Sequence, residues 1–130
     1  MTYELWVLVW AAVLGIVNVL LAPVAAMSRE GYLHWNAGPR DKPFDIGPVA
    51  ERLKRAFSNF METFVFFAVV VIALAFAHKS SDLSLWGARI YLVARGLYLP
   101  CYAFGIAYVR SAFWCASLAG LLMCLATLSL

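Results

Sequence analysis

Residues Glu51 to Glu62 read E-R-L-K-R-A-F-S-N-F-M-E, and this charged stretch continues into the apolar segment 63–77 without a proline or glycine between them. An α-helix advances about 100° per residue, which places four polar side chains within an arc of roughly 80°: Arg52, Arg55, Asn59 and Glu62. Charged groups at membrane depth are costly and usually face a bundle interior or a wet cavity. The stretch therefore predicts a polar functional site on a membrane-embedded helix.

The composition indicates an integral membrane protein. Of the 130 residues, 65% are hydrophobic and 13% are charged, whereas soluble domains are about 45–50% apolar and about 25% charged. Four segments are long enough to cross a hydrocarbon core of about 30 Å: 3–28, 48–78, 83–108 and 111–130. We therefore expect residues 1–130 to form a single domain, an all-α bundle of four transmembrane helices.

The positions of the basic residues predict the orientation of this bundle. Six of the ten lie within residues 29–55, in the first connection and the first turns of the second span, Arg110 lies between the third and fourth spans, and the opposite side holds only Lys79. Cytoplasmic loops of membrane proteins are enriched in Lys and Arg. Both termini are therefore predicted to face outward, and the charged end of the bundle to face the cytoplasm.

The connections between the spans follow from their turn residues. The segment 29–48 contains several glycines and prolines, which exclude a continuous helix. Pro48 suits the first turn of the second span, with Asp45 as a candidate cap. The link 78–84 is short and polar, which makes the second and third spans antiparallel neighbours. The third and fourth spans are expected to be joined by a tight turn near 108–111.

A second polar stripe is predicted in the third span, in the stretch A-R-G-L-Y-L-P-C-Y from Ala94 to Tyr102. Three phenols and one guanidinium fall within an arc of roughly 60° on that helix: Tyr91, Arg95, Tyr98 and Tyr102. Because the second and third spans are expected to be neighbours, the two stripes predict one polar cavity between them.

Each stripe also has a purely structural interpretation. Tyrosines form aromatic belts at membrane interfaces, and Tyr91, which lies deeper than the other two, suits a belt and a site equally. The basic residues of 52–55 can be a topogenic cluster that reaches lipid phosphates. Glu62 can form a structural ion pair with Arg55 or Arg95.

The two stripes resemble the membrane-associated proteins in eicosanoid and glutathione metabolism, the MAPEG family. The segment 51–63 fits the pattern E-R-x-x-R-A-x-x-N-x-x-E-T, which looks like the signature of the family's second helix. The segment 95–102 fits R-x-x-Y-x-x-x-Y and is followed by Arg110-Ser111, which is similar to leukotriene-C synthase and prostaglandin E synthase. The loop G-P-R-D at 38–41 resembles that of bacterial members.

This resemblance implies a homotrimer that binds glutathione between neighbouring four-helix protomers near the cytoplasmic face. Glutathione carries two carboxylates, an ammonium and a thiol, so its recognition suits guanidiniums and one carboxylate. The implied contacts are with the glutathione carboxylates by Arg52 and Arg55, with its peptide backbone by Asn59 and with its ammonium by Glu62, while Tyr98 and Tyr102 supply further polar or stacking contacts. Arg95 shares the tyrosine face and is included in the expected binding site.

The implied activity is that of a glutathione-dependent transferase or peroxidase of the bacterial inner membrane. Arg110 resembles the arginine that stabilises the thiolate; a free thiol has a pKa of about 8.5, which a nearby cation lowers. The lipophilic electrophile or hydroperoxide would arrive from the membrane lipids against Ser111. The family also includes a non-catalytic lipid-binding scaffold of the 5-lipoxygenase-activating type, which is the alternative function.

Several features depart from the family or lie outside the site. Phe57 and Ser58 stand where several animal members carry basic residues, and only Arg29 is a candidate for the arginine that a neighbouring protomer donates. No metal site is expected, because His34 and His78 lie on opposite sides of the membrane and the cysteines have no metal-binding spacing. Those cysteines, Cys101, Cys115 and Cys124, are interpreted as packing residues. No nucleic-acid partner is expected.

Overall fold

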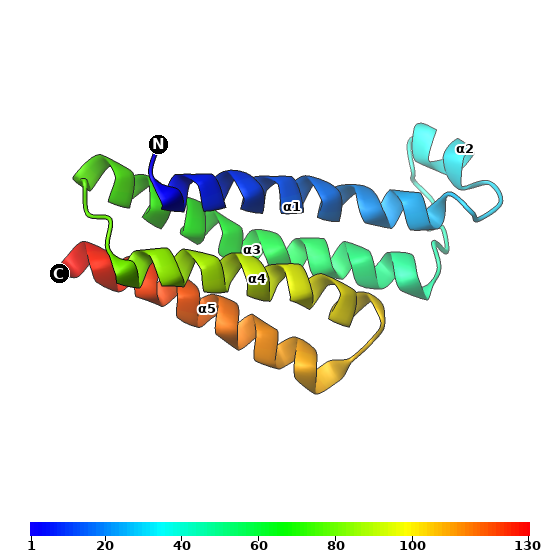
Figure 1. Ribbon diagram of the computed structural model, residues 1–130. Coiled ribbons are helices and arrows are strands. Elements are labelled where there is room, and N and C mark those ends of the chain that lie inside the picture. The colour runs from blue at the N-terminus through cyan, green and yellow to red at the C-terminus, as the bar shows by residue number, and fades with distance from the viewer.

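Four long helices lie side by side in the computed structural model, which describes residues 1–130 (Figure 1). They are α1 (Tyr3–Ala26), α3 (Pro48–Ala77), α4 (Asp82–Ala103) and α5 (Ala107–Ser129). A short helix, α2 (Tyr32–Ala37), lies in the connection between α1 and α3. Both termini lie at one end of the bundle and α2 lies at the other end (Figure 1). The all-α expectation is confirmed, and α2 is an addition that the sequence analysis did not predict.

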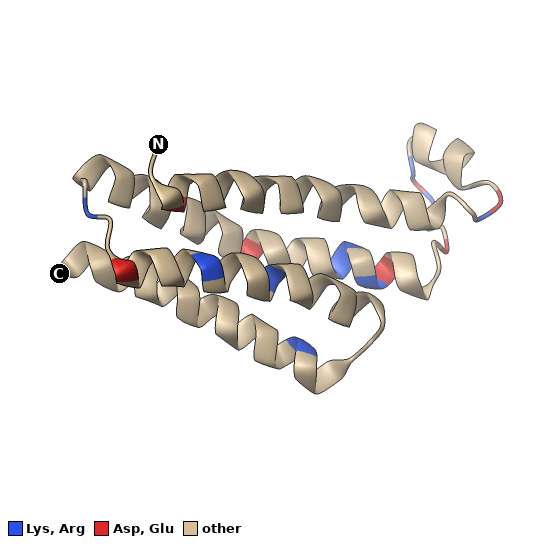
Figure 2. Ribbon diagram, in the orientation of Figure 1, with Lys and Arg blue, Asp and Glu red and all other residues tan.

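Three of the long helices have the length and hydropathy of membrane spans: α1, α3 and α5. The 22-residue α4 is not among them, although it packs against both α3 and α5. Its hydropathy is lower because Arg89 and Arg95 lie in its middle, whereas the charged residues of α3 all lie in the first half of that helix. Charged residues gather toward the α2 end of α3 and in the α1–α3 connection, as the coloured ribbon of Figure 2 shows.

The turn between α4 and α5 lies earlier than predicted. We expected it near 108–111, but α4 ends at Ala103 and α5 begins at Ala107. The chain reverses at Gly105, whose φ of 73° belongs to the left-handed region that glycine enters at little cost. Arg110 consequently lies in the first turn of α5, at the same end of the bundle as Tyr102.

The start of α3 was also only partly predicted. Pro48 is its first residue, as expected, but Gly47 precedes it with a φ of 91° and occupies the cap position assigned to Asp45. The Asp45 side chain instead accepts a hydrogen bond from the Gly47 backbone N–H at 2.9 Å. The Arg29 guanidinium packs over Gly47 so closely that a Cβ there would lie 2.5 Å from Nη2.

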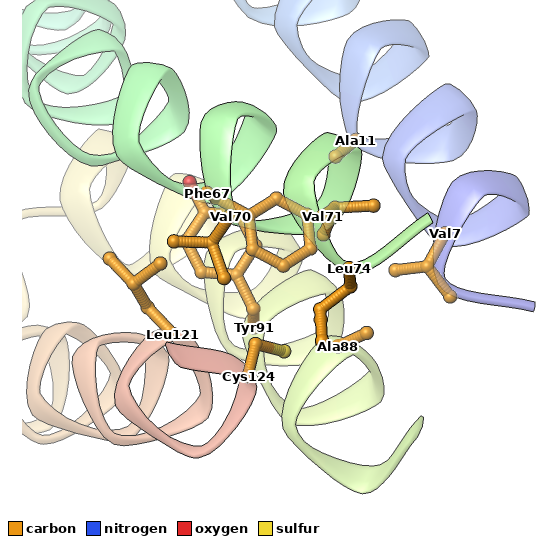
Figure 3. Close-up of a cluster of buried hydrophobic side chains, with 10 residues drawn as sticks. All are labelled: Val7, Ala11, Phe67, Val70, Val71, Leu74, Ala88, Tyr91, Leu121 and Cys124. Atoms are coloured by element: carbon orange, nitrogen blue, oxygen red, sulfur yellow. The ribbon is translucent and has the colours of Figure 1, made fainter. Parts of the chain in front are cut away.

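The main core lies toward the end of the bundle that holds the termini, and α1, α3, α4 and α5 all contribute to it (Figure 3). The Tyr91 ring is fully buried and stacks on Phe67, with ring centroids 4.0 Å apart. Its hydroxyl lies 3.1 Å from Thr63 Oγ1, so the polar end of the ring has a partner. Tyr91 is therefore a core residue and belongs neither to an interfacial belt nor to the site.

Helices α4 and α5 meet at two glycines. A Cβ on Gly87 would lie 2.6 Å from the Gly120 carbonyl oxygen, and a Cβ on Gly120 would lie 2.5 Å from that of Gly87. Small residues at such crossings let membrane helices approach closely enough for their backbones to touch. This contact fixes the separation of α4 and α5, which carry the tyrosines and Arg110.

Gly120→Ala is expected to lower the stability of the protein by about 2–3 kcal/mol, because the new methyl group overlaps backbone atoms of α4 that cannot move aside. Gly96→Ala is the matched control, since a Cβ at Gly96 has no atom within 4 Å. Thermal unfolding of the detergent-solubilised protein, followed by circular dichroism, measures both. Equal melting temperatures for the two variants would contradict the close-packed crossing.

Candidate functional site

The two predicted polar stripes face each other across α3 and α4. Arg95 Nη1 donates a hydrogen bond to Asn59 Oδ1 at 3.0 Å. The stripes also meet nearer the α2 end of the bundle, where Arg55 Nε of α3 donates a hydrogen bond to the Tyr102 hydroxyl of α4 at 3.3 Å. The helical periodicity that placed these residues on single faces therefore predicted which side chains come together.

A cavity of about 300 Å³ lies beside this contact, between α3, α4 and α5. It is lined by residues from all three helices: Asn59, Tyr98, Tyr102, Arg110, Ser111, Trp114 and Cys115. Five of these seven are predicted site residues. Trp114 and Cys115 were missed; the signal for them was available, because they lie four residues after Arg110 and Ser111 and so share their helix face.

Arg110 lies over an aromatic face of this cavity. Its guanidinium carbon is 4.6 Å from the centroid of the Tyr102 ring, and the Tyr98 and Tyr102 rings lie 5.6 Å apart. A cation over a tyrosine face is attracted by the ring's negative face, which fixes the position of Arg110 without neutralising its charge. The cavity is thus walled by phenols, a cation, a hydroxyl and a thiol.

Arg95 lies behind the cavity and does not line it. Only 1% of this residue is exposed, and its guanidinium stands 4.4 Å from the Tyr98 ring centroid and 5.6 Å from that of Phe60. Asn59 accepts a hydrogen bond from Nη1 of Arg95, whereas Nε and Nη2 of Arg95 have no hydrogen-bond partner. Arg95 accordingly holds Asn59 and Tyr98 in place from the protein side, and the structure separates it from the cavity-lining residues.

The remaining predicted site residues lie outside the cavity, on a more exposed side of α3. Arg55 and Glu62 are exposed, and Arg52 is half-buried, with Nη1 3.5 Å from the Ala103 carbonyl oxygen. The ion pair considered for Glu62 is not formed, because Arg55 bonds to Tyr102 and Arg95 bonds to Asn59.

A second cavity, of about 310 Å³, lies on the other side of α3, between that helix, α1 and the α2 connection. Lys54 and Phe57 line it, so Lys54 points away from the polar stripe, as its helical position predicts. Of the four stripe residues of α3, none lines this cavity.

Residues 7–130 match the family model described as "MAPEG family", which is essentially the whole chain. The chain belongs to the MAPEG family. Neither a curated protein nor a solved structure shows significant similarity to it. The MAPEG family includes glutathione transferases, glutathione peroxidases and non-catalytic activator proteins. The family membership expected from the two stripes is therefore confirmed.

In this MAPEG protein, the two ends of the Asn59 amide can have different partners. Its carbonyl oxygen is occupied by Arg95, whereas its NH₂ group can donate into the cavity that the residue lines. An aspartate in its place keeps an acceptor for Arg95 but has no N–H to offer. Asn59→Asp therefore removes only the N–H donor that could contact a ligand, whereas Asn59→Leu also removes the acceptor that supports the Arg95 guanidinium.

Asn59→Leu is expected to lower the stability of the folded protein by about 2–3 kcal/mol, because it removes the one hydrogen-bond partner of a buried guanidinium. Asn59→Asp is expected to retain most of the wild-type stability. Melting temperatures in detergent measure both, with Ser58→Ala, an exposed neighbour, as the control. The interpretation of Asn59 as the support of Arg95 fails if Asn59→Leu melts like the control.

Proposed function

We propose that this MAPEG protein is a membrane-bound enzyme that uses glutathione to conjugate lipophilic electrophiles or to reduce lipophilic hydroperoxides. The observation that carries this proposal is the Arg110 guanidinium on the cavity wall. It stacks on Tyr102 and is not paired with a carboxylate, so its charge remains available to an anion in the cavity.

A thiolate is the anion that suits this position. A free thiol with a pKa of about 8.5 is mostly protonated at neutral pH, and a guanidinium in a cavity with low water content favours the deprotonated form. In a conjugation, the thiolate sulfur forms a bond to the electrophilic carbon, and the leaving group departs with its electron pair. The Ser111 hydroxyl donates a hydrogen bond to the Ala107 carbonyl oxygen at 3.3 Å and lines the cavity, so it would have to rotate to donate a hydrogen bond to that sulfur.

The rest of glutathione requires more charge than the cavity itself contains. Arg52 and Arg55 would bind its carboxylates and Glu62 its ammonium, by charge-assisted hydrogen bonds. These groups border the open side of α3, so the proposed ligand extends from the cavity across that face. Asn59 and the two cavity tyrosines would hold the peptide between these ends.

The exposure of Glu62 supports a homotrimer as the working form. In one protomer this carboxylate lies on an open helix face among the exposed apolar side chains of Met61, Val65 and Phe66. Such a charge is costly against lipid and favours a protein or ligand partner. We propose that neighbouring protomers cover this face and that glutathione lies between them.

The membrane arrangement belongs to the same proposal. α4 would cross the membrane as the third of four spans in chain order. Arg95 is buried in the bundle, Asp82 is the first residue of the helix, and the Arg89 guanidinium is held by the Tyr3 hydroxyl near the end of the bundle that contains the termini. The basic end of the bundle would face the cytoplasm and both termini would face outward from the bacterial inner membrane. The cavity would then receive glutathione from the cytoplasm and the lipophilic substrate from the membrane lipids.

The alternative is a non-catalytic lipid-binding scaffold of the 5-lipoxygenase-activating type. Phe57 and Ser58 favour it, because they stand where several animal members carry basic residues; here Phe57 lines the cavity between α1 and α3. The six polar residues of the proposed glutathione site favour the enzyme: Arg55, Asn59, Glu62, Tyr98, Tyr102 and Arg110.

Arg110→Ala is expected to reduce glutathione conjugation to an aryl halide by at least about a hundredfold, because it removes the cation that stabilises the thiolate. Steady-state rates in detergent micelles test this, with Lys42→Gln, an exposed cation in the α2 connection, as the charge-matched control. Unchanged turnover in Arg110→Ala would remove Arg110 from the mechanism.

The reactivity of the Cys115 thiol distinguishes a variant that binds glutathione but does not react from a variant that no longer binds it. It is exposed and lines the cavity, so S-hexylglutathione, which has no free thiol, should slow its alkylation by a maleimide. Protection in both wild type and Arg110→Ala assigns the defect to the chemical step. Protection of a wild type that turns over no electrophile or hydroperoxide would support the scaffold.

A further inference from the structure

An almost wholly apolar groove of about 330 Å³ runs along α4 and α5 on the lipid-accessible side of the bundle. Six of its lining side chains define it: Trp86, Arg89, Ile90, Val93, Leu97 and Phe113. Val93 is 60% exposed and Trp86 is 56% exposed, so the groove is open to the surroundings. No part of the proposed glutathione site uses it.

The groove and the candidate site occupy opposite faces of α4. Trp86, Val93 and Leu97 recur at spacings of seven and four residues and form one stripe along the helix. Tyr98 and Tyr102, which line the site cavity, lie about 120–160° around the helix from this stripe. A ligand in the groove therefore does not touch the glutathione cavity.

The length of the groove matches one leaflet of a membrane. Trp86 and Leu97 are eleven residues apart, which corresponds to roughly 16 Å of helix. Half of a hydrocarbon core of about 30 Å is about 15 Å. An acyl chain that runs along α4 can fill the groove from the headgroup level to the membrane midplane.

Arg89 ends the groove with a fixed positive charge. Its Nε donates a hydrogen bond to the Tyr3 hydroxyl at 2.8 Å, and the guanidinium carbon lies 4.7 Å from the Tyr3 ring centroid and 5.0 Å from that of Trp86. Helical side chains lean toward the helix N-terminus, so Arg89 leans toward Asp82, at the end of the bundle where both chain termini lie. Tyrosine and tryptophan favour the headgroup level of a membrane, which places the guanidinium beside lipid phosphates.

From this arrangement we propose that the α4–α5 groove is a binding site for one anionic phospholipid. One acyl chain of the lipid would lie in the groove. The phosphate would accept hydrogen bonds from the terminal nitrogens of Arg89, whose guanidinium is held in place by Tyr3 and Trp86. A planar guanidinium binds phosphate through two parallel hydrogen bonds. Charge complementarity and the length of the groove together select a phospholipid over a neutral lipid.

Native mass spectrometry of the delipidated, full-length protein in detergent tests this site by titration with phosphatidylglycerol. Wild type should bind one molecule per protomer in preference to diacylglycerol with the same acyl chains. Arg89→Gln should weaken phosphatidylglycerol binding by about tenfold, the loss expected for charge-assisted hydrogen bonds. Val93→Trp, which fills the groove, should abolish binding, whereas Lys79→Gln and Leu122→Trp serve as charge and volume controls at other exposed positions.

Two results would overturn the proposal. Equal affinity of wild type and Arg89→Gln for phosphatidylglycerol would show that Arg89 does not hold the phosphate, and undiminished binding by Val93→Trp would place the lipid elsewhere. Arg89→Lys provides a second variant should Arg89→Gln fail to fold. Because a single ammonium cannot form the paired hydrogen bonds, Arg89→Lys is expected to bind with intermediate affinity.

Discussion

The burial of the Arg95 guanidinium is the constraint on which the arrangement of α3 and α4 depends. An arginine that is 1% exposed in an apolar bundle is stable only where other groups replace its hydration. Asn59 supplies a hydrogen bond, and the Tyr98 and Phe60 rings supply faces for the cation. These partners come from both helices, so satisfying one charge also aligns the two polar stripes.

The same alignment produces the cavity. Asn59 and Tyr98, which contact Arg95 on one side, line the cavity on the other. The Gly87–Gly120 crossing then holds α5 against α4, so that Arg110 reaches the Tyr102 ring. The contacts of Arg95 and of the two glycines, which determine how the helices pack, thus also position the side chains proposed for catalysis. This coupling gives the buried Arg95 charge a structural role in a chain that is otherwise strongly hydrophobic.

Helical periodicity predicted the parts of the structure that depend on local sequence. The extent of α1 and α3, the polar face of each stripe and the position of Pro48 follow from spacing and from side-chain chemistry within one helix. The α4–α5 turn was predicted too late in the chain because residues 107–110 are as compatible with helix as with turn. The glycine at which the chain reverses, Gly105, lies a few residues earlier. The short helix α2 was missed because it lies among turn residues, where local signals conflict.

Which polar residues face the cavity was beyond the reach of periodicity alone. Arg95 and Tyr98 share a helical stripe, yet the guanidinium lies behind the cavity and the phenol lies on its wall. Cys115 shows the converse, since its apolar neighbours suggested packing while its position on α5 exposes it to the site. Such distinctions depend on how three helices pack together, which no single segment encodes.

The most direct test of a thiol-activating cavity is the ultraviolet difference spectrum of the purified protein mixed with glutathione, compared between wild type and Arg110→Ala. We expect a thiolate absorption band in wild type that folded Arg110→Ala lacks. A band of equal intensity in both proteins, or no band in a wild type saturated with glutathione, would contradict it.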